Sequence, residues 1–327
     1  MKIGRKRILL VAFALVSVVG LGGFYLRPHP GMCVKRDMMF WRTNVRATPV
    51  RDNVFMLSVY GTDLISGNTA ALVGDEGVLL VDPGHPEMLS KLHNALPYLR
   101  DPRVRMVINS HMHQDHSCSN GELFAEGAII VGHSSLRKHY ESPEWDRERQ
   151  PGDAPQVSYD SEMTLPFNGE QVRLLHPPRA HTDGDTITLF ERANVIHTGD
   201  IFVTRAFPYM GGSSIDGYIA AHELILKHSN DKTLVIPGHG PLARRADVEK
   251  SLWRMREVRR RIAALIDQGL NEEEVLARHP LDDLDPYIGD PSGRREVTSP
   301  QAVARHVYAS LTEEPRGETD RRPTITT

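Results

Sequence analysis

The sequence predicts an α/β fold in which short buried strands alternate with helices in two successive halves. The first observation behind this prediction is a series of short apolar runs rich in β-branched residues, separated by turns that contain Gly and Asp. The second is helical spacing of apolar residues in segments between some of these runs. The third is that histidines and aspartates gather just before or after the apolar runs, where side chains from different loops converge.

The first half begins with a meander of strands that we expect to form the first sheet. A helix follows at Pro86–Leu96, because proline stands at its start and apolar residues then recur at helical spacing. Residues 61–67 are equally consistent with a mobile flap over a pocket and with a plain hairpin loop. Residues 141–160 lack periodicity, and we interpret them as a surface loop. The expected strands are 54–60, 69–73, 78–81, 104–108 and 128–131, with a short helix near 120–124.

The second half repeats this alternation, with a helix at 216–228. Its expected strands are 171–175, 186–190, 194–197 and 233–236. From residue 248 onward the pattern becomes helical, with one apolar face and a remainder rich in arginine and lysine. That basic remainder is either a solvated face, which we favour, or a contact for lipid headgroups. Ser299-Pro300 predicts the start of a last helix, and we expect the tail from Thr312 to be disordered because it has almost no apolar residues.

The six residues His111-Met112-His113-Gln114-Asp115-His116 contain four side chains that can bind a metal ion. The expected strand 104–108 leads into them, so they should lie where a strand ends and a loop begins. Neutral imidazole and carboxylate are good zinc ligands. Two histidines one residue apart can reach one ion from an extended backbone while Asp115 and His116 turn towards another. A histidine-rich surface loop is the alternative, and the density of these residues disfavours it.

The overall composition is that of an ordinary globular protein. The 327 residues can hold one large domain or two small ones, and a hydrophobic content of 40% is enough for a core. The formal net charge of -3, from 39 basic and 42 acidic residues, gives no support to a general nucleic-acid surface. A small-molecule substrate is therefore the expected partner, and the composition does not indicate an oligomeric state.

The first thirty residues resemble an export signal in their arrangement. Basic residues from Lys2 to Arg7 precede an uncharged run at Ile8–Leu26, and no clear cleavage site follows. The run is nearly as long as the roughly 20 residues that span a bilayer. We favour an uncleaved membrane anchor over a cleaved signal, with a buried core helix as the third reading. The domain is thus expected to be exported, either periplasmic or anchored to the membrane by residues 8–26.

The sequence has two cysteines, Cys33 and Cys118. Two separate free thiols are the arrangement we favour. An oxidising compartment would also permit a disulfide between them. A third possibility is that the sulfur of Cys118 approaches the metal, because Cys118 comes two residues after His116.

The His-x-His-x-Asp-His spacing resembles the signature of metallo-β-lactamase-fold hydrolases. Further segments resemble this family's third-histidine loop, bridging-aspartate turn, last-histidine turn and early aspartate turn, namely 180–186, 198–200, 237–240 and 81–84. The resemblance covers roughly residues 45–245 and implies a four-layer αβ/βα sandwich with metal bound along one edge. It divides the chain into a signal or anchor at 1–30, a catalytic domain at 31–245, and a helical extension with a disordered tail at 246–327.

The resemblance also implies a set of metal ligands and a nucleophile. One zinc ion would be held by His111, His113 and His181, the second by Asp115, His116 and His239, with Asp200 bridging the two. A hydroxide shared by two zinc ions would attack the substrate, and Asp115 would orient it and carry a proton to the leaving group. Asp82 is either a hydrogen-bond acceptor for a ligand imidazole or a residue that caps a turn.

Departures from the family pattern bear on the substrate. Ser117-Cys118-Ser119-Asn120 stands where many members have two glycines before the asparagine, which predicts a bulkier loop beside the metals. Val203 stands where β-lactam-opening members with a cysteine ligand carry a lysine, and Arg179 and Arg205 are the candidates to replace that lysine. Asp200 resembles the glyoxalase II and lactonase side of the family, but no basic cluster for glutathione is evident.

Three functional classes follow from these residues. The favoured one is a dinuclear zinc hydrolase acting on an ester, thioester, lactone or amide bond, with the amide of a β-lactam among the candidates. The alternatives are a metal-dependent phosphoesterase and a non-catalytic metal-binding protein. A redox di-iron site is disfavoured because flavodiiron members of the fold have glutamate where His113 stands.

Overall fold

The computed structural model describes residues 43–60, 66–96, 102–142, 150–286 and 295–312. The expected anchor at 8–26, most of the expected flap at 61–67 and the tail beyond Thr312 lie outside these residues, so those expectations stay predictions. Within the described ranges, no helix is both long enough and apolar enough to span a membrane.

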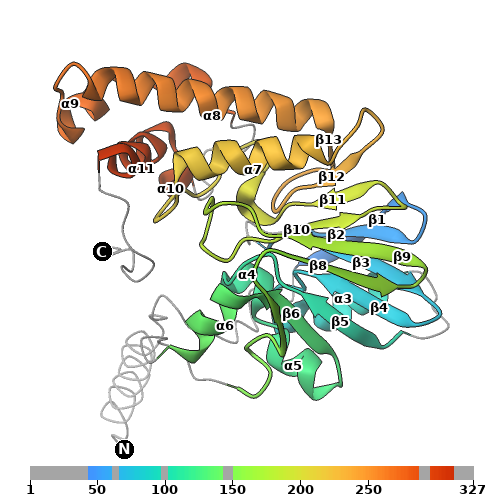
Figure 1. Ribbon diagram of the computed structural model, residues 1–327. Coiled ribbons are helices and arrows are strands. Elements are labelled where there is room, and N and C mark those ends of the chain that lie inside the picture. Colours follow the sequence, from blue (N-terminus) through green and yellow to red (C-terminus); the bar gives the residue numbers. More distant parts are fainter. Residues whose placement is uncertain (1–42, 61–65, 97–101, 143–149, 287–294, 313–327) are drawn as a thin grey trace, which may run out of the picture.

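Two sheets pack face to face, and helices cover the outer face of each (Figure 1). The layers therefore run helix, sheet, sheet, helix, which confirms the predicted αβ/βα sandwich. Apolar side chains fill the three spaces between these layers. The space between the sheets holds Leu72 and Leu79 from one and Leu174 and Phe190 from the other.

The first sheet has seven strands in sequence order. Pairing is antiparallel from β1 to β4 and parallel from β4 to β7. The carboxyl ends of the parallel strands therefore lie at one edge of the sheet, where the histidine stretch leaves β5. The strands are β1 (Asn44–Arg51), β2 (Val54–Tyr60), β3 (Thr69–Gly74), β4 (Gly77–Val81), β5 (Val104–Ile108), β6 (Ile129–His133) and β7 (Val157–Tyr159).

The second sheet has six strands in the order β13-β12-β11-β10-β9-β8. All neighbours are antiparallel except β11 and β12. The strands are β8 (Glu162–Phe167), β9 (Glu170–Leu175), β10 (Ile187–Phe190), β11 (Val195–His197), β12 (Leu234–Ile236) and β13 (Ala243–Arg244).

On the first sheet, helices α3 and α5 cover Leu80, Val107 and Ile130. The helices of this half are α3 (Leu89–Ala95), which follows the short helix η1 (Pro86–Met88), α4 (Gln114–Ser117), α5 (Asn120–Ala125) and α6 (Ser134–Glu141).

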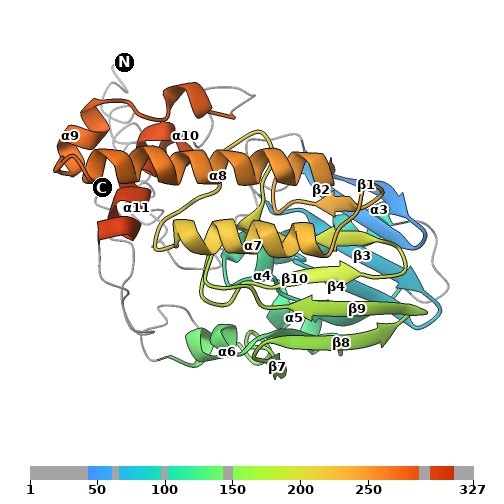
Figure 2. The same ribbon diagram turned by 45° about the horizontal axis from the view of Figure 1, so that its top comes forward.

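The second sheet is covered by α7 (Ile215–Lys227) and by the long helix α8 (Arg245–Ile266), which lie side by side in both ribbon views (Figure 2). Helix α11 (Pro300–Thr312) packs against α7, α8 and α9 (Glu272–Ala277). The short helices η3 (Asp282–Leu284) and α10 (Arg295–Thr298) come between α9 and α11 in the sequence. The second sheet also carries the one-turn helix η2 (Gly199–Ile201), which follows β11. The predicted helical extension is thus a layer over the second sheet.

Several elements were not predicted, and three of them, β1, β8 and α6, have a plain physical reason. Strands β1 and β8 lie at the sheet edges and alternate between exposed and half-buried residues, so they lack a continuous apolar run. Helix α6 is only eight residues long. The interpretation of 141–160 as loop is wrong at Val157–Tyr159, which pairs with β6.

The basic side of α8 is largely paired with acidic residues. Arg256 contacts Glu223 on α7, and Arg259 contacts Asp216 at the start of α7. Arg260 and Arg261 both contact Glu257. These ion pairs favour the solvated-face interpretation over a contact for lipid headgroups.

Candidate metal centre

The seven residues proposed as ligands converge at the edge where the loops of both sheets meet. Strand β5 ends at Ile108, the next residues turn, and α4 then carries Asp115 and His116 back beside His111 and His113. His181 follows β9, Asp200 lies in η2 after β11, and His239 follows β12. Segments far apart in sequence thus deliver the side chains to one place.

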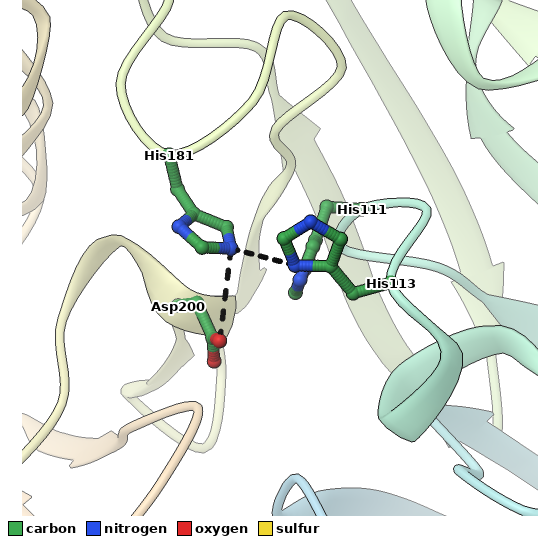
Figure 3. A group of neighbouring side chains, drawn as sticks. All are labelled: His111, His113, His181 and Asp200. Carbon is green, nitrogen blue, oxygen red and sulfur yellow. Dashed lines mark hydrogen bonds and ion pairs between the residues drawn. The ribbon is translucent and has the colours of Figure 1, made fainter. Parts of the chain in front are cut away.

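Four of these side chains form one compact group (Figure 3). One ligand atom each from His111, His113, His181 and Asp200 lie within 4.8 Å of one another. Nε2 of His181 lies 3.0 Å from Nδ1 of His113 and 3.7 Å from Oδ2 of Asp200. We refer to the three histidines of this group as the first set.

Asp115, His116 and His239 form a second group with ligand atoms within 4.8 Å of one another, and we call them the second set. Oδ2 of Asp115 lies 3.5 Å from Nε2 of His116 and 3.3 Å from Nε2 of His239. Oδ1 of Asp200 lies 3.3 Å from each of the same two nitrogens. Asp200 therefore presents Oδ1 to the second set and Oδ2 to the first.

Asp82 orients one imidazole in each set. Its Oδ2 accepts a hydrogen bond from Nδ1 of His116 at 2.8 Å and another from the Ser110 hydroxyl at 2.5 Å. Because that hydroxyl donates to Asp82, it accepts from Nδ1 of His111, 2.9 Å away. Both rings consequently carry their proton on Nδ1 and leave Nε2 free to bind a cation. The hydrogen-bonding role considered for Asp82 is the one observed.

His181 is oriented by neutral oxygen atoms instead. Its Nδ1 lies 3.0 Å from the main-chain carbonyl of Tyr209 and 3.0 Å from the hydroxyl of Tyr218. A carbonyl only accepts hydrogen bonds, so Nδ1 bears the proton and Nε2 is again the free nitrogen. The sequence analysis missed both tyrosines.

Two glycines allow the loops to approach the ligands closely. A Cβ atom at Gly67 would lie 2.4 Å from the ring of His116. A Cβ atom at Gly238, the residue before His239, would lie 2.0 Å from Oδ1 of Asp200. Any larger side chain at either position would displace a residue of the second set or the shared carboxylate.

The electrostatics divide the site into charged and neutral groups. Burial, reinforced by neighbouring imidazoles, holds the pKa of His111 well below its ordinary value and lowers the pKa of His113 to about 3. Burial also opposes charge on His239, but Asp200 and Asp115 outweigh it and raise the pKa of His239 to about 9. In the metal-free protein, the protons on His116 and His239 thus balance the two carboxylates.

The same competition keeps both carboxylates ionised. Burial alone would raise the pKa of Asp200, but His239 and His116 hold it well below its ordinary value. Burial likewise opposes ionisation of Asp115, and His116 outweighs it. Two ionised carboxylates, beside imidazoles that release their extra proton when a cation binds, are suitable ligands for a divalent cation.

Unsatisfied polar atoms test whether these residues fit a metal. Within the described residues, Nε2 of His111, Nε2 of His116 and Oδ1 of Asp200 are buried and make no hydrogen bond. A buried polar atom without a partner is costly, and a coordinated cation supplies that partner. The donor set of imidazole and carboxylate suits zinc and similar ions. The residues therefore fit a divalent metal.

Three other histidines, His133, His176 and His197, and the cysteine Cys118 lie outside both sets. His133 stacks on His176, with ring centroids 3.6 Å apart, and Nε2 of His197 lies 3.0 Å from the carbonyl of Asn68. Cys118 is buried and disulfide-bonded, so the favoured free thiol is wrong there. The other cysteine, Cys33, lies outside the described residues.

Comparisons with known proteins agree with this geometry. The sequence profile described as "Metallo-beta-lactamase superfamily" matches residues 62–262. The chain is 25% identical to a "Metallo-beta-lactamase type 2" of Bacillus cereus over 199 residues, which are 58% of this chain and 73% of that protein. It is 28% identical to a "Coenzyme F420H(2) oxidase" of Methanothermobacter marburgensis over 176 residues, which are 48% of this chain and only 42% of the oxidase.

A solved structure extends the likeness of the fold. The stereoselective inverting sec-alkylsulfatase Pisa1 from Pseudomonas sp. superposes with a TM-score of 0.60 at 14% identity. The superposition covers 82% of this chain and 50% of the sulfatase. The profile match spans more than half of the chain and includes all seven converging residues. The chain therefore belongs to the metallo-beta-lactamase superfamily and is a metal-dependent hydrolase.

Proposed function

We propose that this chain is a dinuclear zinc hydrolase that cleaves an ester, thioester, lactone or amide bond of a small molecule. The observation that carries the proposal is the division of the Asp200 carboxylate between the two sets. Its Oδ1 lies 3.3 Å from nitrogens of the second set, and its Oδ2 lies 3.7 Å from Nε2 of His181 in the first. A carboxylate so placed can bind one cation with each oxygen.

His111, His113 and His181 would hold the first ion, and Asp115, His116 and His239 the second. Zinc ions held there would lower the pKa of a coordinated water to about 7 and would polarise the bond under attack. Asp82, through His116 and Ser110, keeps the imidazole nitrogens pointed at these positions.

Asp115 is the residue we propose for proton transfer. Its side chain is 23% exposed, whereas that of Asp200 is 10% exposed, so Asp115 is the more accessible of the two carboxylates. His116 keeps its pKa low, so the carboxylate is ionised and can accept a proton from the attacking water. It can then return that proton to the leaving group.

Arg179 and Arg205 are the two arginines considered as anchors for an anionic substrate. The guanidinium of Arg179 donates to the carbonyl of Gly212 at 2.6 Å, which ties it to the neighbouring loop. Arg205 is exposed and has a φ angle of 63°. Phosphoester or sulfate-ester hydrolysis is the second candidate, supported by the likeness to the alkylsulfatase. It would need a cationic side chain to hold the anionic group, and the guanidinium of Arg179 already donates to a carbonyl.

The test is a hydrolysis screen of the zinc-loaded protein, with Asp200→Ala as the matched control. The panel comprises β-lactams, acyl lactones, glutathione thioesters, aryl phosphodiesters and a secondary alkyl sulfate. Turnover of a carbonyl substrate that is lost in the control supports the proposal. Turnover confined to the phosphodiester or the sulfate supports the second candidate. Full metal loading without any turnover would instead indicate a non-catalytic metal-binding protein.

We also propose that residues 8–26 anchor an exported domain to the membrane, with the catalytic region at 31–245 followed by the helical extension. The supporting observation is the one-sided positive charge before the apolar run. Full-length protein should sediment with membranes, and a chain starting at Gly31 should not. Recovery of full-length protein with an intact N-terminus in the soluble fraction would contradict the anchor.

A further inference from the structure

His181 is held differently from the two histidines that Asp82 orients. Its Nδ1 faces two neutral oxygen atoms, the carbonyl of Tyr209 and the hydroxyl of Tyr218, each 3.0 Å away. The hydroxyl itself donates a hydrogen bond to the same carbonyl at 3.0 Å. Because its hydrogen is used in that bond, the phenol oxygen accepts the proton of Nδ1. The three groups therefore form a closed triangle of polar contacts.

The position of Tyr218 is fixed by the tight packing of α7 against the third-histidine loop. A Cβ atom at Gly217 would lie 1.5 Å from the carbonyl oxygen of Arg179, so the helix and the loop are in direct backbone contact. The main-chain nitrogen of Ser214 donates to the carbonyl of Ala180 at 3.2 Å, and the Ser214 side chain caps α7 through Gly217. Tyr218 itself is fully buried.

We propose that Tyr218 is a positioning residue for the metal centre, whose hydroxyl holds His181 with its proton on Nδ1 and its Nε2 directed at the first metal position. This inference rests on the proposed role of His181 as a ligand. The phenol group acts in two ways. Its oxygen accepts a hydrogen bond from Nδ1 of His181. Its hydrogen is donated to the carbonyl of Tyr209, which also accepts from Nδ1 of His181. Removing the hydroxyl would take away the hydrogen bond that holds the Tyr209 carbonyl in place. It would also leave Nδ1 of His181 with one hydrogen-bond acceptor instead of two.

A buried tyrosine elsewhere in the described residues provides a matched control. Tyr159 is also buried, and its hydroxyl donates to the side chain of Thr186 at 2.7 Å. Tyr218→Phe and Tyr159→Phe each remove one buried hydroxyl that donates a hydrogen bond, so both are expected to lower stability. Only Tyr218→Phe removes a contact with a metal-binding ring.

The measurement is zinc affinity by chelator competition, with the visible spectrum of the cobalt-substituted protein as a second readout. Partners of ligand histidines typically contribute about 10- to 100-fold in metal affinity. We expect Tyr218→Phe to weaken one of two binding events by at least about tenfold and to change the cobalt spectrum, and Tyr159→Phe to change neither. Wild-type affinities and spectrum in Tyr218→Phe, with a stability loss like that of Tyr159→Phe, would reduce Tyr218 to a packing residue.

A measurement on the unaltered protein keeps the inference testable if Tyr218→Phe does not fold. Nitrogen-15 spectra of the histidine side chains distinguish the two neutral tautomers, and we expect His181 of the metal-free protein to carry its proton on Nδ1. A proton on Nε2 would overturn the inference. Neither readout depends on turnover, so an inactive protein that shows the expected affinities and tautomer would contradict the proposed hydrolysis and leave the role of Tyr218 intact.

Discussion

The loops that carry the proposed ligands bury polar atoms, whereas helices α7, α8 and α11 bury apolar side chains. In the loops, buried nitrogen and oxygen atoms of His111, His116 and Asp200 make no hydrogen bond. In the helical layer, Tyr218, Val258 and similar residues pack with the second sheet in a continuous apolar cluster. A bound cation would supply partners for these atoms in the loops, whereas the helical layer stabilises the chain without one. Changes in the two regions should have separable effects on metal affinity and on stability, except at Tyr218, whose hydroxyl reaches from α7 to His181.

The largest effect that we expect outside the loops concerns His222 on α7. Its ring is fully buried, with Nε2 3.0 Å from the hydroxyl of Ser251 on α8, and burial lowers its pKa from 6.5 to about 4. Above pH 6.5 the ring is neutral in both states. Between pH 6.5 and 4 the unfolded chain binds a proton that the folded chain does not, so stability falls as the pH falls.

That difference corresponds to about 3 kcal/mol over the whole range. We expect His222→Gln to lose much of the acid-dependent fall in unfolding free energy, measured with denaturant on metal-free protein at pH 7 and pH 5. Because the metal ligands titrate in both proteins, the difference between wild type and variant isolates His222. Identical pH dependence in the two proteins would mean that this ring does not titrate in the folded state as its burial requires.

A somewhat smaller effect, confined to metal affinity, is expected for Asp82→Asn. The amide retains the size of the carboxylate but removes its charge and places a donor or a weaker acceptor against Nδ1 of His116. Zinc affinity should fall by about 10- to 100-fold, or roughly 1.4 to 2.7 kcal/mol, by chelator competition. Asp160→Asn is the control, since Asp160 accepts from Ser134 away from both sets. Equal losses in both variants would show that the effect of Asp82 on zinc affinity does not come from its contacts with His116 and Ser110.

The smallest effect is expected for the ion pair that joins α8 to the start of α7. Arg259 and Asp216 have side chains that are 41% and 60% exposed, and water and salt screen such pairs. Arg259→Gln should change the free energy of unfolding by less than about 1 kcal/mol and leave zinc affinity unchanged. Thermal denaturation of wild type and variant at low and high salt measures this change in stability. A loss of more than about 2 kcal/mol would mean that the ion pair stabilises the protein far more than an exposed pair should.

The metal-binding loops could be predicted because their chemistry is carried by residue types at short spacing. The stretch from His111 to His116 contains four candidate ligands within six residues. Asp200 and His239 also lie in short local patterns that can be recognised in the sequence. The buried strands were predictable for a similar reason, since β5 is an unbroken apolar and β-branched run apart from Arg105.

The contacts that orient the ligands could not be predicted in this way. The Tyr209 group that accepts from His181 is a main-chain carbonyl, which any residue would supply. Tyr218 comes 37 residues after His181 and meets it only because α7 packs on the third-histidine loop. Gly67 is important because its lack of a side chain leaves room for the ring of His116. This close approach exists only in the folded chain, so the sequence alone does not show it.

The measurement that tests the central claim most directly is the metal content and turnover of Asp200→Ala on one preparation. Alanine cannot give one oxygen to each set, and it removes the negative charge that offsets repulsion between two dications. We expect the variant to lose the ion held by Asp115, His116 and His239 while it keeps the ion held by three histidines.

Turnover of the best substrate should fall at least about a hundredfold, or roughly 2.7 kcal/mol of barrier. Asp183→Asn serves as a control, because Asp183 is a nearby carboxylate that pairs with His139 instead of either set. One zinc and a hundredfold slower reaction is the result that the account predicts. Two zinc ions bound with wild-type affinity and a near wild-type rate would contradict it.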